Sequence, residues 1–121
     1  TIFRFPKVLV IHLKRFEKTR YSSGKLTTSI KIPPVLDMRP YSTPEINILV
    51  EKGQKVQING ISHHSGSLNG GHYVGEVMDL DDKTWYECND SHCSKLRSGP
   101  DTAAEAPMFY FIYKLEYYNI N

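Results

Sequence analysis

The sequence lacks several features that would place the protein in a familiar class. No apolar run approaches the roughly 18 residues that a membrane-spanning helix needs, and no signal-type leader is present. The 15 basic and 13 acidic residues nearly balance, and the net charge of +2 is spread along the chain. This balance gives no electrostatic case for nucleic-acid binding. We therefore expect an intracellular protein, cytoplasmic or nuclear, with neither a membrane nor nucleic acid as its partner.

Cysteine is scarce, because the chain has only Cys88 and Cys93. Structural zinc normally takes four protein ligands, commonly from two paired elements, and no second pair exists. Cys88 directly precedes Asn89, so on a strand these two side chains point to opposite faces of the sheet. We interpret Cys88 as a buried core thiol and Cys93 as a partly exposed one. We expect no disulfide between them in a reducing compartment.

Helical patterns are also scarce, whereas strand patterns are common. With 121 residues and 40% hydrophobic content, the chain fits one domain with a modest core, and an aromatic share of 12% favours strands. Lys14 and Arg15 end the first predicted strand, where we expect their charges to reach water. One short helix is predicted at 101–106, with Asp101 as its N-cap and Pro107 as its stop. Strands are predicted at 8–16, 26–32, 46–51, 56–62, 73–80, 84–88 and 108–115.

Two polar segments supply a base and a group that can orient it. His72 follows a Gly-Gly pair, and Asn89 comes seventeen positions later with Asp90 beside it. A side-chain oxygen of either residue can accept a hydrogen bond from an imidazole N–H, which is the base-plus-orienter arrangement of a Cys-His hydrolase. If the strand continues, Asn89 and Asp90 alternate faces, so only one of them addresses His72 directly. The matching nucleophile is missing from this chain.

Four motifs appear in a specific order. Residues 6–16 read P-x-x-L-x-x-x-L-K-R-F, and residues 25–38 contain K-L followed by I-P-x-x-L-D-M. Residues 64–73 read H-S-G-x-x-x-G-G-H-Y, and residues 85–90 read W-Y-x-x-N-D. This order resembles the C-terminal half of the catalytic domain of ubiquitin-specific proteases.

The resemblance implies the α+β papain-like cysteine protease fold, with residues 1–121 as a single segment of mostly antiparallel palm sheet and one short helix. The nucleophilic Cys, the helical thumb and the zinc-binding fingers are then expected upstream. The implied activity is thiol-dependent hydrolysis of the isopeptide or peptide bond after the C-terminal Gly of ubiquitin, with no metal or organic cofactor. The implied partners are ubiquitin or ubiquitinated proteins and the Cys-bearing part of the catalytic domain.

Two alternatives to this activity stay open. One is a catalytically inactive ubiquitin-binding or scaffold domain of the same fold. The other is a half-protein that works only with a separate chain carrying the Cys.

The resemblance also assigns roles within the two polar segments. His72 is the expected base, Asn89 its orienter, and Asp90 an assisting residue. The glycines either make a tight turn or leave room for the narrow Gly-Gly tail of ubiquitin to pass close to the backbone. In the second case, and with a negative φ, Gly71→Ala is expected to leave stability nearly unchanged. The expected substrate-binding residues are His64, Ser65, Gly66, Gly70, Gly71 and Tyr73.

Overall fold

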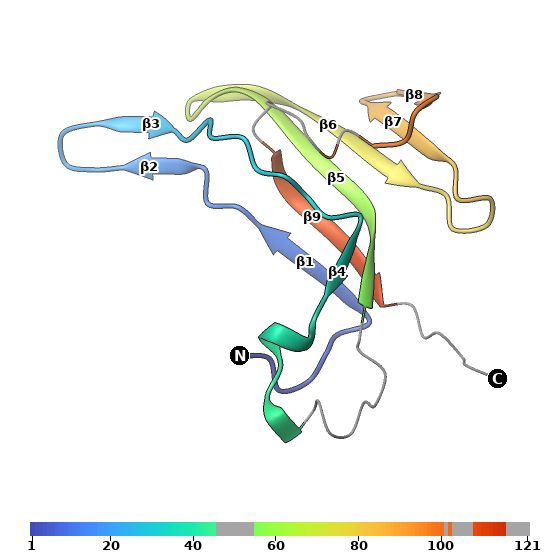
Figure 1. Ribbon diagram of the computed structural model, residues 1–121. Helices are drawn as coiled ribbons and strands as arrows, with labels where there is room; N and C mark the ends of the chain where they lie inside the picture. The colour runs from blue at the N-terminus through green and yellow to red at the C-terminus, as the bar shows by residue number, and fades with distance from the viewer. Residues whose placement is uncertain (46–54, 101, 103–107, 116–121) are drawn as a thin grey trace.

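The computed structural model describes residues 1–45, 55–100, 102 and 108–115. Within these residues, seven strands form one antiparallel sheet in the order β1-β9-β5-β6-β7-β8, with β4 paired to β5, and β2 and β3 form a separate hairpin (Figure 1). The elements are β1 (Val8–His12), β2 (Phe16–Lys18), β3 (Ser23–Lys25), β4 (Val35–Asp37), the 3₁₀ helix η1 (Arg39–Tyr41), β5 (Lys55–Ser67), β6 (Gly70–Met78), β7 (Trp85–Asn89), β8 (His92–Lys95) and β9 (Met108–Leu115). No helix in these ranges is long and apolar enough to cross a membrane.

Most strands of the sheet form where the alternation of apolar and polar residues predicts them. The last predicted strand, 108–115, coincides with β9, and the predicted hairpin of 73–80 and 84–88 is formed by β6 and β7. The predicted strand at 46–51 lies outside the described residues, as does the predicted helix at 101–106 apart from Thr102. The sheet is therefore the part of the fold that local sequence patterns predict best.

The prediction of a strand at 26–32 is wrong, because these residues do not form a strand in the described structure. The Arg15 guanidinium donates instead to the backbone oxygens of Leu26, at 3.2 Å, and Thr28, at 2.5 Å. Arg15 is only 3% exposed, so the expectation that its charge reaches water is also wrong, whereas Lys14 is exposed. A buried side chain thus satisfies carbonyl groups that a neighbouring strand satisfies elsewhere.

The hydrophobic core lies between β5 and the segment that follows β3. Val56, Ile58 and Ile61 of β5 pack with Ile32 and Met38, and each of the five is at most 3% exposed. The pairing of β5 with β9 shifts register between residues 58 and 60. Such a bulge re-aims the strand, so the long β5 contributes to the core at one end and to a surface hairpin at the other.

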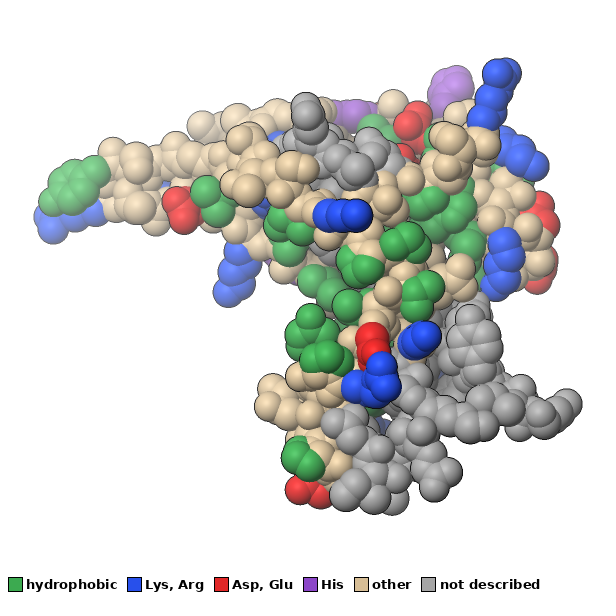
Figure 2. All heavy atoms as spheres, viewed as in Figure 1, with side chains coloured by type: hydrophobic (Ala, Val, Ile, Leu, Met, Phe, Trp, Pro, Cys, Tyr) green, Lys and Arg blue, Asp and Glu red, His purple; other side chains and the backbone are tan. Residues whose placement is uncertain are grey.

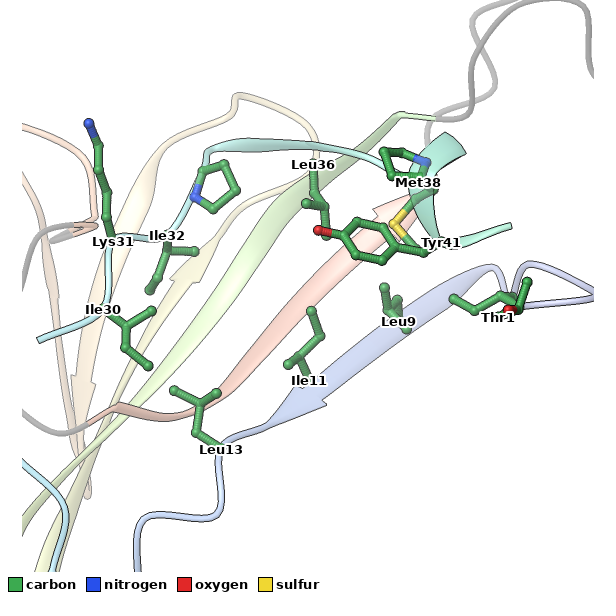
Figure 3. Close-up of a pocket in the computed structure, with 13 residues that line it drawn as sticks. Thr1, Leu9, Ile11, Leu13, Ile30, Lys31, Ile32, Leu36, Met38 and Tyr41 are labelled. Carbon is green, nitrogen blue, oxygen red and sulfur yellow. The ribbon is translucent and has the colours of Figure 1, made fainter. Parts of the chain in front are cut away.

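A pocket of about 560 Å³ lies between β1 and the segment 30–41. Figure 3 shows Leu9 and Ile11 of β1 on one side of it, with Leu36 and Tyr41 on the other. Hydrophobic side chains also gather on the visible face over β4 (Figure 2). No residue that lines the pocket belongs to the predicted site, and several of them pack against the core. The pocket therefore belongs to the hydrophobic packing of the sheet and is separate from the predicted site.

Candidate functional site

His72 and Asn89 meet across two neighbouring strands. His72 lies in β6, Asn89 ends β7, and the ring Nε2 of His72 is 2.6 Å from the side-chain Oδ1 of Asn89. Because an amide oxygen only accepts, Nε2 carries the hydrogen and donates it, which leaves the lone pair on Nδ1. Both residues are exposed, so Nδ1 is available to a group that approaches from outside. The arrangement fixes the tautomer and the plane of the ring, as a base in a hydrolase requires.

Asp90 occupies the turn between β7 and β8, and the structure does not bring it onto the His72 ring. Its φ of 51° is in the left-handed region, which Asp tolerates better than most residues. Cys88 and Asn89 are consecutive residues of β7, so their side chains lie on opposite faces of the sheet. The condition of the prediction, a strand that continues through Asp90, is not met, because β7 ends at Asn89.

The hairpin of β5 and β6 carries the predicted substrate-binding residues. Its register pairs Ser65 with His72 and Gly66 with Gly71. Gly66 has a φ of +113°, and a Cβ there would lie 2.6 Å from the oxygen of Gly70 and from Cα of Gly71. Gly66 therefore serves the turn itself, since L side chains rarely adopt this backbone conformation.

The expected tolerance of Gly71 to alanine is wrong. Its φ is not in the positive range, but a Cβ there would fall on Nε2 of His64 and on the backbone oxygen of Ser65. Gly70 differs, because a Cβ built on it meets no atom within 4 Å. The two neighbouring glycines thus have different structural requirements, and Gly70 is the one that leaves open space.

His64 is buried, with 4% exposure, and its ring packs between two aromatic rings. Its centroid lies 5.6 Å from that of Phe16 and 4.6 Å from that of Tyr73, which itself is half-exposed. Burial, together with the positive charge of Lys25, lowers the pKa of His64, so the neutral ring is favoured. This placement favours a role in shaping the hairpin. Ser65, next to it, is exposed.

Lys25 also contacts this hairpin, although no role in the site was predicted for it from the sequence. Its Nζ contacts the ring and the backbone of His64 and the backbone of Gly66. Burial, and then the charge of Arg15, lower the pKa of Lys25. A lysine after a serine- and glycine-rich turn carries no local signal for such contacts, because its acceptors lie 39 to 41 residues further along the chain.

Cys88 and Cys93 form a disulfide across β7 and β8, contrary to the expectation of two free thiols. The register places them directly opposite each other, with Cα atoms 4.2 Å apart, so no backbone movement is needed to join them. Cys88 is half-buried and Cys93 is exposed, and neither lies in the core. The bridge closes the hairpin whose turn follows Asn89.

Comparison with known proteins identifies the family. The sequence model described as "Ubiquitin carboxyl-terminal hydrolase" matches residues 1–112. Ubiquitin carboxyl-terminal hydrolase 2 of Gallus gallus is 32% identical over 112 residues, which is 92% of this chain and 30% of that protein. The Homo sapiens protein of the same name is 33% identical over 112 residues, 92% of this chain and 18% of its own length. The chain belongs to the ubiquitin carboxyl-terminal hydrolase family.

Solved structures agree with this assignment. The chain is similar to a structure of the SAGA Ubp8(S144N)/Sgf11/Sus1/Sgf73 DUB module, with a TM-score of 0.80, 28% identity, and coverage of 97% of this chain and 25% of the other. A second structure of that module, bound to monoubiquitin, gives a TM-score of 0.79 at 27% identity, with coverage of 97% and 25%. The predicted α+β papain-like fold with a mostly antiparallel segment is thus confirmed. The chain spans less than a third of these curated relatives and about a quarter of the solved chains.

Proposed function

We propose that this chain is the His-bearing palm portion of a deubiquitinase, a thiol protease that hydrolyses the isopeptide or peptide bond after the C-terminal Gly of ubiquitin. The observation that carries the proposal is the 2.6 Å contact between His72 Nε2 and Asn89 Oδ1, found within a segment that matches the family. Solved relatives support ubiquitin as the partner, because Ubp8 modules are described as bound to monoubiquitin and to ubiquitin aldehyde.

In the proposed reaction, His72 is the base and Asn89 its orienter. Asn89 holds the hydrogen on Nε2, so Nδ1 takes the proton of a Cys thiol supplied by an upstream segment or by another chain. The thiolate attacks the carbonyl carbon of the ubiquitin C-terminal Gly, and the C–N bond breaks as His72 returns the proton to the leaving amine. The ubiquitin C-terminus is then joined to the Cys as a thioester. His72 takes a proton from a water molecule that attacks the thioester carbonyl, and it returns this proton to the departing sulfur. Ubiquitin is released and the thiol is restored. Asp90 assists from the adjacent turn.

A neutral amide is sufficient as the orienter in this chemistry. The thiolate and the imidazolium form their own pair of opposite charges, so the orienter need not carry a charge. Asn89 mainly holds the ring plane and the tautomer, since its oxygen accepts from one ring nitrogen only. No metal or organic cofactor takes part in the proposed steps.

The ubiquitin tail is proposed to pass along the hairpin of β5 and β6. Gly70 offers open space at its exposed end, and Ser65 lies opposite His72 in the register. Gly66 and Gly71 permit the two strands to approach closely, and half-exposed Tyr73 borders the same hairpin. An extended peptide can bind such a surface through its backbone, provided that no side chain obstructs it.

The proposal is tested in the complete enzyme with a fluorogenic ubiquitin C-terminal reporter. His72→Ala should lower kcat/KM by about 10²- to 10⁴-fold, the usual contribution of general acid–base catalysis. His92→Ala is the matched control, because His92 is exposed on the neighbouring strand β8 and should keep wild-type turnover. A protein that binds ubiquitin but does not turn over the reporter would support the inactive scaffold instead. Turnover that survives His72→Ala would contradict the assigned base.

A further inference from the structure

Lys25, the last residue of β3, makes three hydrogen bonds to the outer end of β5. Its Nζ lies 2.9 Å from Nδ1 of His64, 2.8 Å from the backbone oxygen of His64 and 3.2 Å from that of Gly66. An ammonium group has three N–H donors and no acceptor, so Lys25 donates in each of these contacts. Figure 1 shows the end of β3 beside the loop that joins β5 and β6. Lys25 thus fixes the projecting β2–β3 hairpin to this loop.

The two backbone oxygens belong to the outer end of β5, past its last described pair with β9. In the described residues, β9 pairs with β5 only as far as His63. His64 and Gly66 are two positions apart, so their carbonyl groups point to the same side of the strand. Lys25 donates to both carbonyl groups, as the backbone N–H groups of a neighbouring strand do elsewhere in the sheet. Between them lies Ser65, which the register places opposite His72.

The ring of His64 provides a second route from Lys25 to the site. Nδ1 accepts from the ammonium group, so Nε2 carries the ring hydrogen. The same Nε2 edge lies against Gly71, where a Cβ would collide with it. Gly71 immediately precedes His72 in β6. The orientation of the His64 ring therefore limits how close β5 and β6 can lie beside the proposed base.

We propose that Lys25 is a positioning residue for His72: its ammonium group holds the outer end of β5, and through Ser65 and Gly71 it sets where the base stands. The inference rests on the proposed function. Because Lys25 acts on His72 through its contacts with His64 and Gly66 of β5, its removal should misplace His72 and leave the binding of ubiquitin largely intact. A misplacement of about 1 Å in an active site can lower the rate on the order of 10²-fold.

The test compares three variants of the complete enzyme with the ubiquitin reporter. Lys25→Met keeps the length of the side chain but removes all three donors, and kcat should fall by about 10- to 100-fold with KM changed less than about threefold. Lys25→Arg keeps the charge and several donors, and should recover part of kcat. Lys18→Met is the matched control, since Lys18 is exposed on the same hairpin and should leave both constants unchanged.

The outcomes separate this inference from the proposed function. If the wild type turns over the reporter and His72→Ala does not, the proposed function stands regardless of Lys25. A wild-type kcat for Lys25→Met, or a loss of activity that matches the loss of folded protein by circular dichroism, would then overturn the positioning role. Equal losses in the Met and Arg variants would overturn the hydrogen bonding as its cause. A selective loss of kcat that Arg partly restores would support it.

Discussion

Single Gly→Ala substitutions in the β5–β6 hairpin can distinguish glycines that the fold requires from a glycine that leaves room for the substrate. Gly70→Ala adds a Cβ into open space at a backbone conformation without positive φ. Stability should stay the same or rise by about 0.4–1 kcal/mol, because alanine has fewer unfolded conformations to lose. If Gly70 borders the channel for the ubiquitin tail, the same methyl group obstructs it. Reporter kcat/KM should then fall by about 10-fold or more, as expected for a displaced substrate.

Gly71→Ala should show the opposite pattern in stability. Its Cβ would fall on the His64 ring and on the Ser65 carbonyl, so β5 and β6 must move apart. Overpacking of this kind costs typically about 1–3 kcal/mol. Gly66→Ala should also be destabilised, by roughly 1–2 kcal/mol, because its φ of +113° suits glycine.

Urea denaturation and reporter kinetics on the same three variants of the complete enzyme provide the assay. Each activity is compared per mole of folded protein, so that lost stability is not counted as lost catalysis. A Gly70→Ala variant with wild-type kinetics would remove Gly70 from the proposed channel. A Gly71→Ala variant as stable as the wild type would refute the close approach of β5 and β6 on which the prediction rests.

Three further predictions concern the orienter, the buried histidine and the disulfide. Asn89→Ala should lower reporter kcat by about 10- to 100-fold through misplacement of the base, whereas Asn89→Asp still accepts from Nε2 and should keep most of it; equal activity of the two would count against the orienter. The pKa of His64 is lower in the folded protein than in the unfolded chain, where it is about 6.5. The neutral ring therefore stabilises the folded state above about pH 6.5, and this stabilisation is lost as the pH falls towards the lower pKa of the folded protein. His64→Phe should reduce the pH dependence of the free energy of unfolding below about pH 6.5, and identical profiles would contradict this. Reduction of Cys88–Cys93, a sequence separation of 5, should destabilise the hairpin by about 2 kcal/mol from loop-closure entropy, and equal unfolding midpoints in urea would exclude such a contribution.

Local patterns predicted the two strands next to the site, although the predicted bounds of 73–80 and 84–88 stop one residue short of His72 and of Asn89. The alternation of β6 and β7 and the polar turn between them are signals within a few residues. Asn89 and Asp90 are separated by the end of β7 at Asn89, because Asp90 already lies in the turn with a φ of 51°. The short β8 was missed, because His92–Lys95 has no apolar alternation and is exposed at every position. Its pairing with β7 depends on the turn at Asp90 and not on its own composition.

Long-range polar contacts were not predictable from the sequence. Arg15 and Lys25 look like surface charges in their local context, yet one is buried and the other contacts residues 39 to 41 positions away. The disulfide was missed for a related reason. Five positions of separation fit many backbone paths, and only the β7–β8 register places Cys88 opposite Cys93.

The bridge between Cys88 and Cys93 bears directly on how the proposed thiol-dependent activity would be measured. A buffer with a dithiol reductant would keep a catalytic thiol reduced, but the reductant's thiolate also attacks a disulfide and ends with both of its own sulfurs oxidised. Cys93 is exposed, so this reagent has access to the bridge as well as to a nucleophile. Turnover measured in that buffer then describes an open hairpin next to Asn89, whereas the structure describes a closed one. A Cys88→Ser, Cys93→Ser double variant has the same hairpin chemistry with or without reductant, and so supplies the reference against which the two buffers can be compared.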